Sequence, residues 1–349
     1  MASMDPTATT RLAAAFGDLA VRLGVRDDAG ATAAELLRIT GEPRRHSILT
    51  DSAVPVEVSL KLDERGVPTL RCVIDMVEHR AGDWEHSLTH ARSVTGCSTA
   101  EQDARLLELF RTHLAGAPAG LAAPLMLGLG YGAGGRRRGT VYFRTGWLGP
   151  DELAARFPLR TESLGEAERL HGCRLPGAVE VMGYDLVGGE LTAWKTYKWL
   201  PVDPGRAFGD RAGTHPDLLP ARRLHDRFAG VSRPRPADRS LFLQLSHDGA
   251  VTRQKVFFFC AAWGWDRPEG LAELLGFLQR TSGHDLGPLL RLRAAMAAHG
   301  AGVRLGLIAV GGARRRPSLT FYFWPVGGPS RSASGRPGGS GGRSTPPGF

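Results

Sequence analysis

Five stretches of the chain each contain two short runs of alternating apolar and polar side chains, joined by a polar or glycine-rich turn. This pattern predicts β-hairpins, because successive side chains of a strand point to opposite faces. The five stretches are residues 54–76, 124–145, 178–200, 240–263 and 303–325. If they are equivalent, the matching positions in their second strands are Val73, Tyr142, Tyr197, Phe257 and Tyr322, at intervals of 69, 55, 60 and 65 residues. Such regular spacing predicts a repeated supersecondary unit.

The segments between the hairpins have apolar residues three and four positions apart, which is typical of helices with one buried face. They are residues 100–114, 151–172, 218–230 and 270–300, and residues 10–24 and 32–41 form a similar pair ahead of the first hairpin. The predicted unit is therefore helix, helix, strand, strand, repeated five times.

This order predicts an α+β fold in which five ααββ repeats form one closed, ten-stranded antiparallel β-barrel with helices around it. Closing the sheet removes its exposed edges. A barrel of ten strands is also wider than the eight-stranded barrels whose side chains fill the interior, so we expect a solvent-accessible lumen. Apolar strand residues should face the helices and polar ones the lumen. We expect residues 1–326 to form this single domain and residues 327–349, rich in Gly, Ser, Pro and Arg, to be a disordered tail.

Charge adds a candidate ligand class to this picture. The chain has a net charge of +9, of which three charges come from arginines in residues 327–349, a segment without acidic residues, so +6 remains for the rest. Two predicted strands place basic residues on one face with aromatic ones: Lys195 with Tyr197, and Arg253 with Lys255 and Phe257. A cationic stripe inside a barrel fits an anionic ligand, although the net charge by itself also fits a general solubility charge.

The remaining composition favours a reduced, cytoplasmic protein. The four cysteines form no CxxC pair and no short secreted framework. No apolar run approaches the roughly 20 residues of a membrane span, and the first residues lack the charged start and apolar core of a signal peptide. We therefore expect neither a membrane nor a nucleic acid as a partner.

Several strand motifs resemble those of the αββα-barrel (ABBA or PT-barrel) aromatic prenyltransferases, and specifically the indole prenyltransferases of the dimethylallyltryptophan-synthase type. The resemblance covers roughly residues 10–325 through the five-unit order. The motifs are PVEVSL with Glu57, TLRCVID with Arg71, TVYF with Tyr142, AWKTYKW with Lys195 and Tyr197, RQKVFFF with Arg253, Lys255 and Phe257, and the fifth-unit Tyr322. Three positions depart from the family pattern: Thr140 replaces a lysine, Ala193 an arginine and Phe257 a tyrosine.

The resemblance implies an enzyme that transfers a dimethylallyl or longer prenyl group from an allylic diphosphate to an indole-containing small molecule. It implies Glu57 as the catalytic residue. It also implies Arg71, Lys195, Arg253 and Lys255 as diphosphate ligands, and Tyr142, Tyr197, Tyr322 and Phe257 as shields of the allylic cation. The chain has no DDxxD run, only the adjacent Asp27 and Asp28. We therefore expect no metal site, no cofactor and no requirement for Mg²⁺.

Two other functions fit the same residues. The barrel could instead prenylate a phenol, a phenazine or a peptide tyrosine, because Glu57 is the single residue that indicates an indole acceptor. It could also be a non-catalytic barrel that binds a hydrophobic or phosphorylated ligand. Thr140, Ala193 and Phe257 reduce the number of basic and tyrosine residues that the family pattern contains. In each enzymatic case the partners are a small aromatic acceptor and a prenyl diphosphate.

Three further motifs have simpler explanations. Glycines within residues 130–135 satisfy GxGxxG, but a strand pattern rather than a helix follows them, which argues against a dinucleotide site. His86 and His90 stand four apart without the glutamate of an HExxH metal motif, so we interpret them as surface histidines. The arginine triplets at 136–138 and 314–316 lie in predicted turns without interleaved aromatics, which favours solvated turns over nucleic-acid binding.

Overall fold

The computed structural model describes residues 6–40, 54–76, 84–119, 121, 124–201, 207–208, 211, 214–229, 240–248, 251–312 and 316–326. Within these residues the predicted hairpins all form. Their strands are β1 (Val56–Leu62), β2 (Pro68–Asp75), β3 (Leu125–Tyr131), β4 (Arg137–Arg144), β5 (Val181–Val187), β6 (Glu190–Trp199), β7 (Leu241–Asp248), β8 (Val251–Phe259), β9 (Val303–Gly311) and β10 (Ser318–Pro325). The predicted tail, residues 327–349, lies outside the described residues, so the division into domain and tail stays a prediction.

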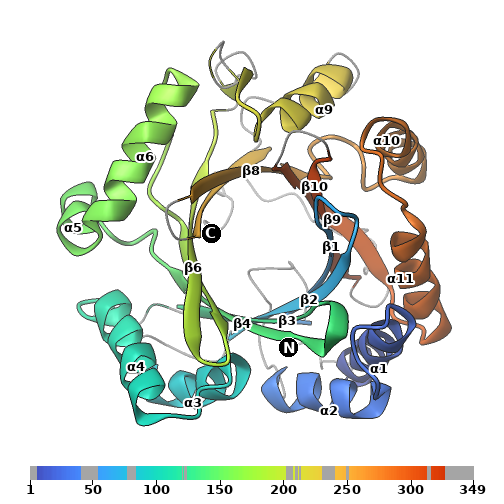
Figure 1. The fold of residues 1–349 in the computed structure, drawn as a ribbon, viewed down its shortest axis with the longest axis horizontal. Helices are drawn as coiled ribbons and strands as arrows, with labels where there is room; N and C mark the ends of the chain where they lie inside the picture. Colours follow the sequence, from blue (N-terminus) through green and yellow to red (C-terminus); the bar gives the residue numbers. More distant parts are fainter. Residues whose placement is uncertain are drawn as a thin grey trace, which may run out of the picture.

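The ten strands close into one antiparallel barrel, as predicted. Each strand pairs with its neighbours in the chain, and β1 closes the ring by pairing with β10. Viewed down the barrel axis, the sheet forms a ring with the helices on its outside (Figure 1). Because strands far apart in the sequence meet only through closure, the β1 and β10 seam brings together the two ends of the domain.

The helices surround the barrel in the order of the chain (Figure 1). The longer ones are α1 (Pro6–Arg22), α2 (Ala29–Thr40), α3 (Trp84–Thr95), α4 (Ala100–Leu114), α5 (Pro150–Arg156), α6 (Pro158–His171), α9 (Leu219–Ala229), α10 (Pro268–Thr281) and α11 (Gly287–Ala298). The sequence pattern did not predict α3, because its buried stripe has only Leu88, Ala91 and Val94 among polar residues. Asp28, one of the two adjacent acidic residues noted in the sequence, caps α2. Its carboxylate accepts a hydrogen bond from the Ala31 N–H at 2.9 Å.

The strands have the predicted two faces. In β1, the alternate residues Val56, Val58, Leu60 and Leu62 are fully buried in the layer between sheet and helices, where α11 packs against the strand. Burying an aliphatic side chain of this size contributes about 1.5–3 kcal/mol. The residues between them, including Glu57, point to the lumen. A register slip of one residue would exchange the two faces, so the outer apolar layer fixes which side chains enter the barrel.

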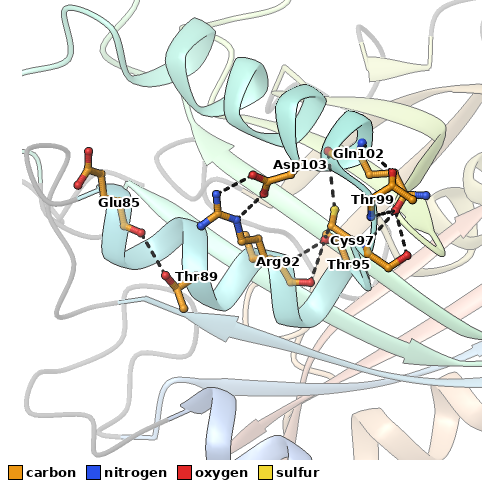
Figure 2. Close-up of polar contacts among 10 residues, drawn as sticks. Glu85, Thr89, Arg92, Thr95, Cys97, Thr99, Gln102 and Asp103 are labelled. Carbon is orange, nitrogen blue, oxygen red and sulfur yellow. Dashed lines mark hydrogen bonds and ion pairs between the residues drawn. The ribbon is translucent and has the colours of Figure 1, made fainter.

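Polar contacts at the start of α4 connect helices α3 and α4 to each other and to one hairpin of the barrel. Figure 2 shows the ion pair between Arg92 and Asp103 and the capping box of Thr99 and Gln102, in which each residue bonds the backbone N–H of the other. Gln102 also donates to the Gly188 carbonyl at 2.8 Å, in the turn between β5 and β6. These contacts hold the hairpin whose lumen face forms part of the site described below.

Candidate active site

The second strands of the five hairpins contribute one lumen-facing residue each to a common cluster. These residues are Val73, Tyr142, Tyr197, Phe257 and Tyr322, which confirms that the five positions are equivalent. The four aromatic rings follow one another around the wall: the ring centres are 6.2 Å apart for Tyr142 and Tyr197, 5.9 Å for Tyr197 and Phe257, and 5.5 Å for Phe257 and Tyr322. We call these four rings the aromatic belt. Its cluster is separate from the apolar core under the helices.

Glycines on neighbouring strands make room for this belt and for Arg71. A Cβ at Gly128 or Gly183 would come within 3.2 Å and 2.8 Å of the Tyr142 ring, and one at Gly130 within 3.0 Å of the Arg71 side chain. Gly130 lies in β3, and the remaining glycines of the GxGxxG motif lie in the turn to β4, so no helix follows them. The motif therefore serves the lumen wall and the hairpin turn, in agreement with the interpretation of the sequence.

A cavity extends from the belt toward the end of the barrel where Glu57 lies. The space free of protein atoms is about 770 Å³, including space open to solvent, and lies in the range of pockets that hold small molecules. Its wall is largely aromatic and aliphatic, with two carboxylates and one arginine: Glu57, Val73, Met126, Tyr142, Arg144, Glu180, Val181, Tyr197, Trp199, Phe242, Phe257, Phe259, Leu307, Tyr322 and Trp324.

Glu57 is 3% exposed and lies beside Trp324 across the seam between β1 and β10. Its Oε2 accepts a hydrogen bond from the Trp324 indole N–H at 2.7 Å. Burial raises the pKa of Glu57 to about 7, against the opposing effects of the Trp324 hydrogen bond and the Arg71 charge. A carboxyl group that titrates near neutral pH suits general base catalysis.

Basic side chains gather on the lumen face on the other side of the belt, toward the hairpin turns. This group, which we call the cationic end, consists of Lys61, Arg71, Arg138, Lys195 and Lys255, and Asp185 lies among them. Arg71 donates to the Tyr142 hydroxyl at 2.9 Å and so joins the cationic end to the belt. The carboxylate of Asp185 acts on four of these basic groups and that of Glu64 on Lys255, so basic groups outnumber carboxylates at this end.

Asp185 takes up part of that charge. Its Oδ1 accepts hydrogen bonds from Lys195 at 2.6 Å and from the Thr140 hydroxyl at 2.7 Å, and Arg138 lies 3.6 Å from Oδ2. Burial would raise the pKa of this carboxyl, but the charges of Lys195, Arg71 and Arg138 hold it well below its usual range. Thr140, which stands where the family pattern has a lysine, thus supports the carboxylate that orients Lys195.

Among the residues that the structure describes, neither Lys61 nor Lys255 forms an ion pair with a carboxylate, although the charges of Asp185 and Glu64, respectively, favour their charged forms. Lys255 donates to Ser318 at 2.9 Å and Thr320 at 3.4 Å. Burial, followed by the charges of Lys61, Arg71 and Lys195, lowers its pKa well below the ordinary value. The same causes, burial first and then Arg71, Lys195 and Arg138, lower the pKa of Lys61 to about 8. A bound anion would offset the repulsion among these basic groups and would compensate the charged lysines for their lost hydration.

Arg253 precedes Lys255 by two residues on the same strand but differs from it in exposure and partner. Its side chain is 54% exposed and forms an ion pair with Glu64 at 3.1 Å. The structure therefore brings together Arg71, Lys195 and Lys255 of the four predicted diphosphate ligands and leaves Arg253 at the solvent with its own counter-ion. Its role in binding a diphosphate stays a prediction.

Two members of the cationic end were missed by the sequence analysis. Lys61 follows Glu57 by four residues and Arg138 precedes Tyr142 by four, so strand periodicity could have placed both on the lumen face. The triplet at 136–138 had been interpreted as a solvated turn. Arg136 is exposed and Arg137 bonds Glu35 at 2.7 Å, whereas Arg138, whose side chain is 48% exposed, also lies 3.6 Å from the buried Asp185. The interpretation is therefore incomplete for Arg138.

The remaining candidates contribute no site in the part of the chain that the structure describes. Among those residues, no group of three or more His, Cys, Asp or Glu is arranged to hold a metal ion. None of their helices is long and apolar enough to cross a membrane. His79, the His86 side chain and the second triplet's Arg314 and Arg315 lie outside the described residues.

Comparison with known families and with curated proteins found no match at the level of sequence. Solved structures do match. The 5-dimethylallyltryptophan synthase from Streptomyces coelicolor aligns with a TM-score of 0.69 and 20% identity, over 95% of this chain and 100% of that one. A 6-dimethylallyltryptophan synthase from Micromonospora olivasterospora, in complex with DMASPP and Trp, aligns with a TM-score of 0.68 and 19% identity, over 90% and 96%.

A third structure extends the likeness to another enzyme of this fold. The prenyltransferase PriB, in a ternary complex with L-tryptophan and dimethylallyl thiolodiphosphate, aligns with a TM-score of 0.63 and 21% identity, over 90% of this chain and 95% of that one. All three alignments span nearly the whole of both chains. The likeness establishes that this chain has the barrel fold of these enzymes.

Proposed function

We propose that the protein is an aromatic prenyltransferase, which transfers a dimethylallyl or longer prenyl group from an allylic diphosphate to an indole-containing small molecule. The observation that carries the proposal is the layout of one lumen: Glu57, with a pKa of about 7, at one end, the aromatic belt in the middle and the cationic end beyond it. Two dimethylallyltryptophan synthases of the same fold were solved in complex with DMASPP and Trp.

The reaction needs the carbon–oxygen bond of the allylic diphosphate to break, with the electron pair leaving on the diphosphate. Arg71, Lys195 and Lys255 are suited to receive that negative charge, because charge-assisted hydrogen bonds in a closed site strengthen as charge develops. We add Lys61 to this set, since the charges of Arg71 and Lys195 act on it within the same group. It supplies one basic side chain where Thr140 and Ala193 replace two.

The aromatic belt suits the protection of the allylic cation. Ring faces attract a cation, and the apolar wall that these side chains form helps to exclude water that would otherwise capture it. Phe257 offers the same face as a tyrosine without its hydroxyl. Burial raises the pKa of Tyr197 and Tyr322 well above the ordinary value, so both phenols stay neutral beside the cation.

Glu57 is suited to the acceptor. A carboxylate that accepts the indole N–H increases the electron density of the ring, whose carbon attacks the allylic cation and forms the new carbon–carbon bond. The ring carbon then loses its proton to Glu57 or to the released diphosphate, which restores aromaticity. The cationic end and Glu57 together favour this reaction over a non-catalytic ligand-binding barrel, because binding alone requires no buried carboxyl group titrating near pH 7.

The test is incubation of the purified protein with dimethylallyl diphosphate and a panel of acceptors: tryptophan and other indoles, tyrosine and other phenols, a phenazine and a tyrosine-containing peptide. We expect a mass gain of one C₅H₈ group on an indole, with no loss of activity in a chelator. Transfer to phenols alone would replace the acceptor class. No product with any acceptor, while pyrophosphate still binds, would favour the non-catalytic barrel. The cytoplasmic location stays a prediction.

A further inference from the structure

We propose that Trp324 is a positioning residue for Glu57: its indole N–H holds one carboxylate oxygen and leaves the other for the acceptor. The inference rests on the proposed function for its catalytic meaning, but its structural part does not. The bond from Trp324 Nε1 ends on Oε2 at 2.7 Å. Among the described residues, no donor bonds Oε1. Both Glu57 and the half-buried Trp324 line the cavity.

The surrounding strands hold the indole of Trp324 in place. β9 bulges beside it, because Tyr322 pairs with Leu307 and Phe323 with Leu305, so Gly306 is skipped in the register. The indole lies over this glycine, where a Cβ would come within 2.3 Å of the ring. The Arg304 guanidinium also lies over the indole, 5.4 Å from the ring centre. The bulge thus creates a seat that only glycine leaves open.

This seat gives the carboxylate an orientation before any acceptor binds. A carboxylate oxygen has two lone pairs, and a group free to rotate would lose part of the gain from a second N–H bond in ordering. With Oε2 held by one indole N–H, Oε1 is directed to the cavity for another. The internal indole therefore makes the same kind of contact that the proposed acceptor makes.

The bond also influences the charge of Glu57. Hydrogen bonding to the ionised form favours that form, so Trp324 opposes the effect of burial on the pKa of Glu57. Among the described residues, the other titratable groups acting on Glu57 are Arg71 from β2, which favours the ionised form, and Tyr322 from β10, which stays neutral. Arg144 and Glu180 line the same cavity, and Arg304 lies over the Trp324 ring. Loss of the indole N–H therefore has one expected direction: the Glu57 pKa rises further above about 7.

The experiment compares the wild type with Trp324→Phe, which removes the N–H and keeps an aromatic ring. Protein labelled with ¹³C at the glutamate side-chain carboxyl is titrated by NMR, and the Glu57 signal is assigned by its absence in Glu57→Gln. We expect the Glu57 titration to move to higher pH in Trp324→Phe. The ratio of variant to wild-type kcat/KM should fall up to about tenfold at pH 6 and recover toward pH 9. Titration of the cationic-end lysines affects both proteins and cancels in the ratio.

Two further variants separate positioning from general damage to the cavity. Gly306→Ala keeps the indole but forces it from its position over residue 306. It should therefore reproduce both the higher Glu57 pKa and the lower kcat/KM at pH 6. Trp199→Phe is the matched control: Trp199 lines the same cavity and donates its indole N–H to a different carboxylate, Glu180, at 3.1 Å. Its Glu57 titration should equal that of the wild type.

The outcomes are distinct. An unchanged Glu57 titration in both Trp324→Phe and Gly306→Ala would overturn the inference. A similar shift in Trp199→Phe would also overturn it, because the effect would then belong to the cavity as a whole. If no indole is prenylated, the proposed function fails, but the NMR titration still decides whether Trp324 controls Glu57.

Discussion

The two ends of the lumen are built on the same strands and treat charge in opposite ways. At one end Glu57 is a buried acid that accepts a hydrogen bond from an indole N–H, and burial raises its pKa to about 7. At the other end basic side chains lie close enough to repel one another, with Asp185 among them, and burial with this repulsion lowers the pKa of Lys61 to about 8. Desolvation disfavours the charged form in both places. Each end therefore holds a group whose charge becomes more favourable when its partner binds.

The comparison shows how a barrel keeps incompatible chemistry apart. Glu57 and Lys61 lie on one strand face four residues apart, or about 13 Å along the strand. That length leaves room for the aromatic belt between them. The acid and the amines therefore do not form an ion pair that would neutralise both. The largest test of this separation is to change one end and measure the function of the other.

Replacing Glu57 with Gln should have the largest effect. The variant keeps the size of the side chain but loses the charge, so turnover of an indole should fall by about 10²- to 10⁴-fold. Binding of inorganic pyrophosphate, measured by calorimetry, should stay within about twofold of the wild type, since the cationic end is intact. Near-normal indole prenylation would remove Glu57 from the mechanism, and a large loss of pyrophosphate binding would mean that the two ends are not independent.

Replacing Lys255 with Met should weaken the other end. The change removes one charge-assisted contact, so pyrophosphate affinity should fall by about 10- to 100-fold, while the Glu57 titration is unchanged. Lys198→Met is the control, because the Lys198 side chain lies outside the cationic end, where its amine donates a hydrogen bond to the Gly177 carbonyl. Equal losses in the two variants would mean that pyrophosphate binds outside the lumen.

Pyrophosphate binding should also take up protons near pH 8.5. The pKa of Lys61 is about 8 in the empty barrel and is lowered by burial and by neighbouring cations, so a bound anion raises it. At pH 8.5 the neutral fraction of Lys61 must gain a proton on binding, and affinity falls as pH rises above about 8. Calorimetry in buffers of different ionisation enthalpy measures the uptake. Lys61→Arg should reduce the proton uptake and leave only the part that Lys255 contributes. An unchanged uptake would contradict the proposal that Lys61 takes up a proton when pyrophosphate binds.

The smallest effect should come from Arg253→Ala. Because this side chain is mostly exposed and paired with Glu64, its removal should change pyrophosphate affinity by less than about threefold. The matched comparison is Arg71→Ala within the cationic end, where a much larger loss is expected. A loss at Arg253 as large as that at Arg71 would return Arg253 to the diphosphate site and show that its ion pair with Glu64 opens on binding.

Strand periodicity in the sequence determined the barrel and most of its lumen face. Side chains alternate with a period of two, so the pattern around Tyr142, Tyr197 and Phe257 located equivalent positions without any knowledge of contacts. The same local rule could have added Lys61 and Arg138. It failed for α3, because a helix whose buried stripe contains an alanine has too weak an apolar pattern to stand out.

Only the tertiary structure decided which charges are available. Lys195 and Arg253 look alike in sequence, but one lies against Asp185 inside the lumen and the other against Glu64 at the solvent. The partner of Glu57 was equally hidden, because Trp324 lies 267 residues away and meets it where β10 closes on β1. Periodicity assigns a face to each side chain, whereas pKa and pairing depend on burial and on neighbours that closure of the barrel brings together.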